Sequence, residues 1–252
     1  MPGFVSHTVM ARDVYNTIDK NKVDIDYMIS YSLGGDLCKY AKCRYDSHHK
    51  DMDKFIYTMA DYIKENNLVN NKEIMGVLYG HICHYVMDCM IHPLVRMIDK
   101  VCIKNKHNHT LIEEYYDSYL VKERYEIEKK EYLKKRVLKA KANRKISKML
   151  DYVYTKVYNT QKVSIYYNLN LLLYRLLSKI YIIFSKGFIE KIIGLNRFLD
   201  NNKSVDIFNE DNKIMYKDYL RNECSNSLMS LYEESIDVAR EYIKNINNYL
   251  NI

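Results

Sequence analysis

The chain has 252 residues, of which 48% are hydrophobic and 28% charged, and its net charge is +7. This composition can bury a core and excludes an intrinsically disordered chain. With 7 Gly and 2 Pro, the chain has too few turn-forming residues for a β-sandwich, a β-barrel or a doubly wound sheet. We therefore expect an all-α fold, whose positive charge favours anionic partners such as phosphates, nucleic acid or lipid headgroups.

The N-terminal residues and the cysteines predict where the protein works. The first residues contain no basic segment followed by an apolar one, so no secretory signal is expected. No run of about 18 uncharged apolar residues occurs, which argues against a transmembrane span. The six cysteines form no CxxC pair and are interpreted as reduced thiols. We expect a cytoplasmic protein whose contact with a membrane, if it has one, is peripheral.

The first predicted helices place polar residues among apolar ones. A helix is expected from about Ser6, which would cap it, with His7 on the inward face beside Met10 and Val14. A second helix, about 25–33, ends at two glycines that leave Asp36 at a helix end. A third begins around residues 47–49, with His48 on its buried side.

Further helices are predicted along the rest of the chain. The most apolar one of the first half spans about 71–90, and Pro93 ends it or starts the next helix. A loop at 104–109 precedes a helix that begins near His109. A long charged helix is expected from about 122 to 150, followed by amphipathic helices with a polar connection at 200–212. The core would comprise residues 1–120, with 121–252 as further helices packed on the same domain.

Histidine is concentrated in the first part of the chain. All eight histidines lie at or before position 109, and the chance of this in a random sequence is roughly one in a thousand. They are His7, His48, His49, His81, His84, His92, His107 and His109.

Two spacings indicate metal binding. His84 and Asp88 are four residues apart on one predicted helix, so that both can reach one ion, and His109 and Glu113 repeat this geometry on another. His92 lies four residues beyond Asp88. Imidazole and carboxylate donors without thiolates suit a hydrolytic zinc site rather than a structural, cysteine-rich one.

Each of these features alone has a simpler interpretation. One His-x-x-x-Asp pair is more often a solvated helix pair, and His7 alone would be a hydrogen-bonded core histidine. We interpret His49, His81 and His107 as supporting or loop residues, although a shift of one residue in helix phase would exchange His49 with His48. The combination favours metal, because burying so many unpaired imidazoles and carboxylates would cost several kcal/mol each.

The order of these residues resembles the zinc-dependent phospholipase C family, which shares an all-helical fold with the single-strand-specific zinc nucleases. The matching elements are Ser6-His7, Asp36, Ser47-His48, His84-Tyr-x-x-Asp88, His92 and His109-x-x-x-Glu113. The N-terminal Met-Pro-Gly-Phe-x-x-His is similar to a non-secreted bacterial branch related to the phospholipase C/D domain. The resemblance covers roughly residues 1–120 and implies a multi-helix bundle that encloses a multi-zinc site.

The resemblance also implies which residues bind Zn²⁺, in a cluster of two or three ions. One zinc would be bound by Asp36, His48, His84 and Asp88, and a second by His92, His109 and Glu113. The third would be bound by His7 and the far oxygen of Asp88. In secreted relatives an N-terminal tryptophan completes the third site; this chain has no tryptophan, and removal of Met1 would offer the Pro2 amine instead.

The expected activity is hydrolysis of a phosphodiester, most simply in a phospholipid, with Asp36 orienting the attacking water or accepting its proton. Two alternatives are cleavage of single-stranded nucleic acid and a metal-binding module without catalysis. The basic segment Lys134–Lys148 is interpreted as a solvated helix face, with contact to an anionic membrane surface as its alternative.

Overall fold

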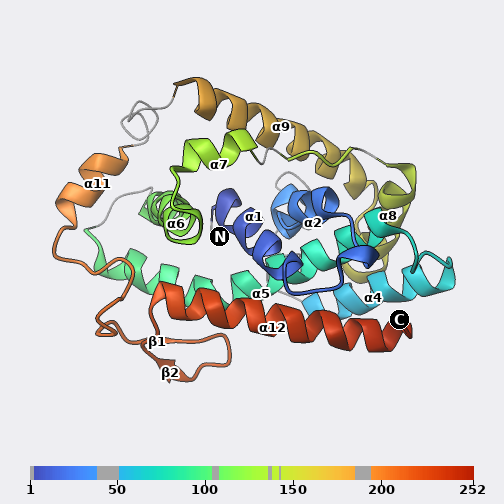
Figure 1. The fold of residues 1–252 in the computed structure, drawn as a ribbon. Helices are drawn as coiled ribbons and strands as arrows, with labels where there is room; N and C mark the ends of the chain where they lie inside the picture. The colour runs from blue at the N-terminus through green and yellow to red at the C-terminus, as the bar shows by residue number, and fades with distance from the viewer. Residues whose placement is uncertain (1–2, 39–50, 104–107, 136–137, 142, 185–193) are drawn as a thin grey trace. The chain divides into compact units, whose positions relative to one another are not determined.

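The computed structural model describes residues 3–38, 51–103, 108–135, 138–141, 143–184 and 194–252 (Figure 1). It is mostly helical, which confirms the all-α prediction. In chain order its elements are α1 (Phe4–Tyr15), η1 (Lys20–Lys22), α2 (Ile25–Tyr31), η2 (Gly34–Cys38), α4 (Met52–Glu65), α5 (Lys72–Val101), α6 (Asn108–Tyr125), α7 (Lys129–Lys135), α8 (Arg144–Tyr158), α9 (Val163–Phe184), α11 (Leu195–Asn201), β1 (Tyr216–Lys217), β2 (Glu223–Cys224) and α12 (Leu228–Leu250).

The chain divides into two compact units. The first comprises Met1–Val9, Val86–Val137 and Ser178–Ser235, and the second Met10–Tyr85, Leu138–Leu177 and Ile236–Ile252. Each unit takes residues from both sides of position 120, and α1, α5, α9 and α12 are helices that continue from one unit into the other.

Aromatic residues form much of the core in both units. In the second unit α4 packs against α8, and the Phe55 ring meets Tyr154 edge-on with their centroids 4.9 Å apart. In the first unit the ring of Phe208 stacks on Tyr115 and Tyr119 of α6. The buried Tyr116 also has a partner for its hydroxyl, which donates to the carbonyl of Ile207 over 2.6 Å.

Helix α5 extends beyond its predicted end. Pro93, which was expected to end this helix or to start the next one, lies inside α5, which continues to Val101. The helix continues because buried apolar residues lie on both sides of the proline, Ile91 before it and Leu94, Val95 and Ile98 after it. By length and composition α5 could cross a membrane, since an 18-residue stretch of it has a mean hydropathy of 1.3. However, 89% of that stretch is buried inside the protein. A core helix has these same properties.

The predicted long charged helix at 122–150 is wrong. Helix α6 ends at Tyr125 and Glu126 adopts a left-handed φ of 55°, and α8 begins only after Asn143, whose side chain accepts a hydrogen bond from the Lys145 amide. Between α7 and α8, Leu138 and Ala140 are buried in a non-helical segment. Leu138 and Ala140 are thus buried without a continuous helix.

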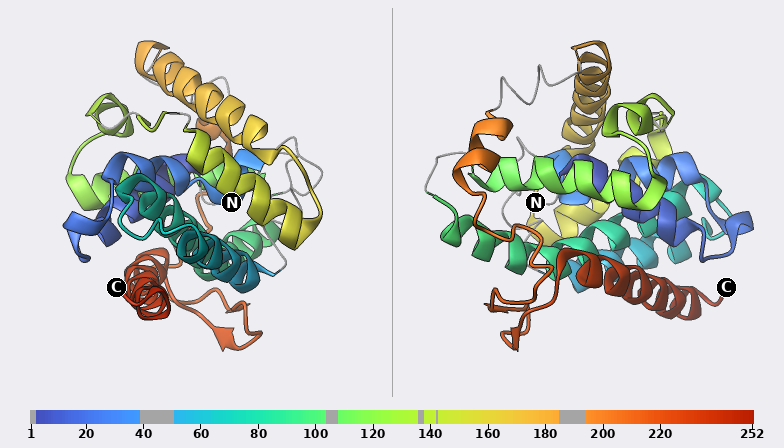
Figure 2. Two further views of the ribbon diagram at one scale, coloured as in Figure 1. Left: turned by 90° about the vertical axis from the view of Figure 1, so that its right-hand side faces the viewer. Right: turned by 60° about the vertical axis from the view of Figure 1, so that its left-hand side comes forward.

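A short hairpin was missed in the last part of the chain. Strands β1 and β2 pair antiparallel, with Tyr216 opposite Cys224 (Figure 2). The Asn209 side chain holds the base of the hairpin, donating to the carbonyls of Ile214 and Ser225 and accepting from the Ile214 amide. Two-residue strands carry no periodic pattern. The sequence therefore predicted amphipathic helices here, beyond a polar connection at 200–212, and over 216–224 that prediction is wrong.

Candidate metal centre

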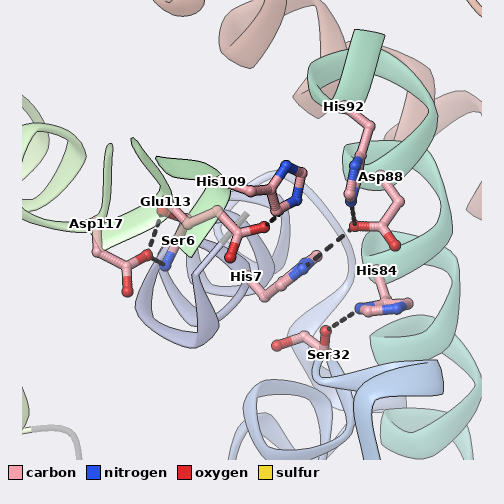
Figure 3. Close-up of polar contacts among 9 residues, drawn as sticks. All are labelled: Ser6, His7, Ser32, His84, Asp88, His92, His109, Glu113 and Asp117. Atoms are coloured by element: carbon pink, nitrogen blue, oxygen red, sulfur yellow. Dashed lines mark hydrogen bonds and ion pairs between the residues drawn. The ribbon is translucent and has the colours of Figure 1, made fainter. Parts of the chain in front are cut away.

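Five of the predicted donors converge in the first unit (Figure 3). Asp88 Oδ1 lies 3.4 Å from His7 Nε2 and 3.6 Å from His92 Nε2. On α6, His109 Nε2 lies 2.9 Å from Glu113 Oε1. The His92 and His109 rings link the two groups, with centroids 5.7 Å apart. Three helices, α1, α5 and α6, therefore bring imidazoles and carboxylates from positions 7 to 113 together.

Burial keeps the imidazoles of His92 and His109 neutral. It lowers the pKa of His92 to about 3, although Asp88 opposes the shift, and it lowers the pKa of His109 to about 4. Burial also raises the pKa of Glu113 to about 8. A neutral imidazole has a lone pair for a metal, whereas a protonated one does not.

The chemistry of these donors fits zinc. Nitrogen and oxygen donors at helical spacing are the usual ligands of hydrolytic zinc sites. The buried Nδ1 of His92 also makes no hydrogen bond to any of the described residues. A buried polar atom in this state needs a partner, and a bound cation is one that suits an imidazole nitrogen.

A residue that the sequence analysis did not single out, Asp117, holds the N-terminus of α1. Its carboxylate accepts hydrogen bonds from the Val5 amide at 3.2 Å, the Ser6 amide at 2.7 Å and the Ser6 hydroxyl at 2.5 Å. The prediction that Ser6 caps the helix is therefore wrong. Ser6 lies within α1 and is bound by Asp117 (Figure 3). A Cβ on Gly3 would lie 2.3 Å from Asp117 Oδ2, so glycine permits this close approach.

Asp117 fixes the helix turn that carries His7, and its position continues the spacing of His109 and Glu113 by four more residues. That spacing was the available signal in the sequence. Burial raises the pKa of Asp117, whereas Lys129 and the hydrogen bonds from Ser6 and Val5 lower it.

The second unit contains two further predicted donors, Asp36 in η2 and His84 in α5, both of which are buried. His84 Nδ1 lies 3.1 Å from the Ser32 carbonyl oxygen. Since a carbonyl only accepts, Nδ1 carries the proton and Nε2 keeps the lone pair that a metal would bind. Gly34, with φ of 42°, allows the contact, because a Cβ there would lie 2.3 Å from the His84 ring.

Asn170 of α9 supports the segment that carries Asp36. Its amide donates to the Leu37 carbonyl at 2.9 Å, so that η2 is tied to α9 one residue after the carboxylate. No local sequence pattern indicates this contact, which joins residues 133 positions apart.

Of the remaining histidines, His81 lies among the described residues and three others do not. His81 is a hydrogen-bonded core histidine, as interpreted from the sequence, with Nδ1 2.8 Å from the Val77 carbonyl and Nε2 2.9 Å from the Tyr167 hydroxyl. His48, His49 and His107 lie outside the described residues. The assignment of His48 as a ligand, and the choice between His48 and His49, therefore stay predictions.

A family model described as zinc-dependent phospholipase C matches residues 6–160 of the chain. This match extends beyond the 1–120 region over which the resemblance was recognised, and it includes all eight predicted ligands. No curated protein and no solved structure matches the chain significantly. Since the family model spans more than half of the sequence, the chain belongs to the zinc-dependent phospholipase C family.

Proposed function

We propose that this protein is a zinc-dependent phosphodiester hydrolase that cleaves phospholipids in the manner of a phospholipase C. The observation that carries the proposal is the family match, whose range includes the cluster of His7, Asp88, His92, His109 and Glu113. Its members are the donor types of a hydrolytic zinc site.

The proposed ligands are those that the family resemblance implies. Asp36, His48, His84 and Asp88 would bind one Zn²⁺, and His92, His109 and Glu113 a second. His7 and Asp88 would bind a third. Asp88 Oδ1 lies between His7 and His92, at 3.4 Å and 3.6 Å from their Nε2 atoms, which supports its role as a shared ligand.

The residues have distinct tasks in this proposal. Bound zinc supplies Lewis acidity toward the phosphoryl oxygens and lowers the pKa of a water ligand. The Asp36 carboxylate orients the attacking water or accepts its proton. The Ser32 carbonyl fixes the tautomer and orientation of His84, and Asp117 fixes the helix end that carries His7. No side chain is needed as a nucleophile.

The first test combines metal analysis with turnover. We expect mass spectrometry to find two or three zinc ions per chain. We also expect the protein to hydrolyse p-nitrophenyl phosphorylcholine and a chelator to abolish this activity. His84→Ala and Asp88→Ala should lose both zinc and activity, whereas the control His107→Ala should keep both. One zinc or none without turnover, or equal zinc in all three variants, would contradict the proposal.

The second test identifies the substrate class. Phosphatidylcholine vesicles and single-stranded DNA are compared at equal phosphodiester concentration, with zinc-loaded protein. Release of diacylglycerol and phosphocholine supports a phospholipase C. Cleavage of the DNA without release of diacylglycerol would instead support the nuclease alternative.

A further inference from the structure

Helix α9 exposes a continuous row of large aliphatic side chains. We call this row the α9 stripe; its members, between 39% and 71% exposed, are Ile165, Leu169, Leu172, Leu176, Ile180 and Ile183. Their spacing of three and four residues places them on one side of the helix, over a length of roughly 27 Å. Exposed apolar surface of this extent is unusual in a soluble monomer and marks an interaction surface.

The opposite side of α9 is the side that packs on the protein. Tyr167 is buried there and hydrogen-bonds to both His81 and Tyr154. Asn170 is buried as well and donates to Leu37, next to Asp36. Ser164 binds Asp151 through its amide and its hydroxyl. These polar contacts fix the rotation of α9, so the stripe faces outward.

Cations flank the stripe. Residues 163–184 contain Arg175 and Lys179 and no acidic residue. Arg175 donates to the carbonyls of Leu138 and Ala140 and thereby holds segment 138–141 against α9. That segment presents the exposed side chain of Lys141, whereas the exposed Lys139 pairs with Asp26 at 4.0 Å. The stripe therefore has Arg175 and Lys179 on its own helix and Lys141 on the segment held against it, on a chain whose net charge is +7.

We propose that the α9 stripe is a membrane-docking surface, which lies in the interfacial layer of an anionic phospholipid bilayer with α9 parallel to the surface. Aliphatic side chains that enter the acyl boundary beside cations that meet anionic headgroups are the features of an interfacial helix. This surface lies outside the proposed active site. The proposal rests on the proposed phospholipid hydrolysis in one respect only, because that activity is the reason for the protein to meet a bilayer.

The position of Lys179 favours lipid over a second copy of the chain. Lys179 follows Ile165 and Leu172 at intervals of seven residues, so it would occupy a core position if two α9 helices packed together. Burying its ammonium there would be unfavourable. At a bilayer, the long side chain reaches the headgroups while its methylenes stay apolar.

A fluorescence experiment tests the surface directly. The chain has no tryptophan, so Leu172→Trp introduces a single reporter in the stripe and Leu220→Trp one in an exposed position of the hairpin. Zinc-loaded protein is mixed with vesicles of phosphatidylcholine containing phosphatidylserine, and the tryptophan emission spectrum is recorded within the first minute. We expect the emission maximum of Leu172→Trp to shift to shorter wavelength and that of Leu220→Trp to stay unchanged. No shift, or equal shifts in both, would overturn the proposal, as would a concentration-dependent shift without lipid, which indicates a second copy.

Vesicle sedimentation measures how much the α9 stripe contributes to membrane binding. Leu172→Gln/Leu176→Gln should lower the vesicle partition coefficient at least about tenfold, because two leucines no longer enter the apolar layer. The control Met215→Gln/Leu220→Gln removes two leucine-sized side chains of similar exposure and should change it less than about twofold. Lys141→Gln/Lys179→Gln should weaken binding to anionic vesicles but not to neutral ones. Equal partition of the stripe and control variants would refute the docking surface.

The soluble substrate separates the two proposals. Hydrolysis of p-nitrophenyl phosphorylcholine should be unchanged in the stripe variant, since no bilayer is involved. If no protein hydrolyses it while vesicle binding still depends on the stripe, the proposed function fails and the docking surface stands. If hydrolysis is intact and binding ignores the stripe, the docking surface fails alone.

Discussion

Asp117 does for α1 what a capping residue usually does from the position just before a helix. It reaches the first turn from α6 and accepts hydrogen bonds from two amides and one hydroxyl. An anionic side chain is also favoured at this end of a helix by the helix dipole. Since His7 follows Ser6 directly, the cap and the proposed metal ligand are mechanically linked.

Asp117→Ala should therefore destabilise the protein and weaken zinc binding. Removing the carboxylate leaves three buried donors of α1 without their acceptor, which should lower the free energy of unfolding by about 2–3 kcal/mol. Urea denaturation measures the stability and competition with a chromogenic chelator measures the zinc affinity. The control Asp200→Ala changes an exposed carboxylate paired with Lys203 and should leave both near the wild-type values. Unchanged zinc affinity in Asp117→Ala would show that the cap does not position His7.

Gly34 and Gly194 offer a matched pair of substitutions, since both have positive φ. Gly194→Ala introduces backbone strain alone, of about 1 kcal/mol, because nothing lies within 4 Å of the new Cβ. Gly34→Ala adds a clash with the His84 ring. We expect Gly34→Ala to cost more stability than Gly194→Ala and to be the one of the two that lowers zinc affinity, in the same two assays. Equal effects of both would exclude the close contact with His84.

His81 should make stability depend on pH. Burial lowers its pKa to about 4, against 6.5 for an exposed histidine. The unfolded chain therefore binds a proton first, and the free energy of unfolding falls as the pH drops from about 6.5 to about 4. The full effect is about 3 kcal/mol. It is measured by urea denaturation at pH 7 and pH 4.5 with a chelator present.

The comparison with His81→Phe isolates this histidine from the others. Phenylalanine fits among the rings of Tyr31, Phe55 and Tyr167 that surround His81, and it does not titrate. The variant should lose less stability than the wild type between the two pH values. Parallel losses would mean that His81 does not contribute to the acid sensitivity.

At the scale of elements, Pro93 shows how far packing can override a local signal. Proline removes one backbone donor and is strongly unfavourable inside a helix, yet α5 continues through it because both flanking segments are apolar and buried. The apolar periodicity predicted the helix correctly, whereas the proline led to a wrong prediction of where the helix ends. Likewise, the charges at 122–150 favoured a helix but supplied no continuous apolar face to hold one.

Pro93→Ala should consequently stabilise α5. It restores an amide that can donate to the carbonyl of Cys89, and we expect the free energy of unfolding to rise by about 1–3 kcal/mol. Thermal denaturation monitored by circular dichroism checks this in the metal-free protein. Lys100→Ala, at an exposed position of the same helix, serves as the near-neutral control. A loss of stability in Pro93→Ala would instead show that the surrounding packing requires the proline ring.

At the scale of the whole molecule, zinc should contribute to stability as well as to activity. A ligand at one hundred times its dissociation constant stabilises the folded state by about 2.7 kcal/mol, which for a chain of this size corresponds to roughly 5–10 °C in melting temperature. A chelator should lower the melting temperature of the wild type by this amount. The shift should be smaller in Asp88→Asn and unchanged in the exposed control Asp200→Asn. No shift in the wild type would contradict metal binding by the folded protein.

The sequence by itself determined the helical fold class and which helices of the first half carry the imidazoles and carboxylates. Scarce glycine and proline excluded sheet folds, and helical spacing placed His84, Asp88 and His92 on one side of α5, because the periodicity of a helix is a local property. His48 was also predicted this way and lies outside the described residues.

Only the tertiary structure decided which groups support those donors and which side of each helix faces outward. The contacts of Asp117 with Ser6 and of Asn170 with Leu37 join residues more than 100 positions apart, and no local pattern encodes such pairs. Helix α9 is apolar on both sides, so its periodicity cannot say which one is buried. Polar contacts at Ser164, Tyr167 and Asn170 settle it, because each buried polar group needs its partner and only one rotation of the helix provides them all.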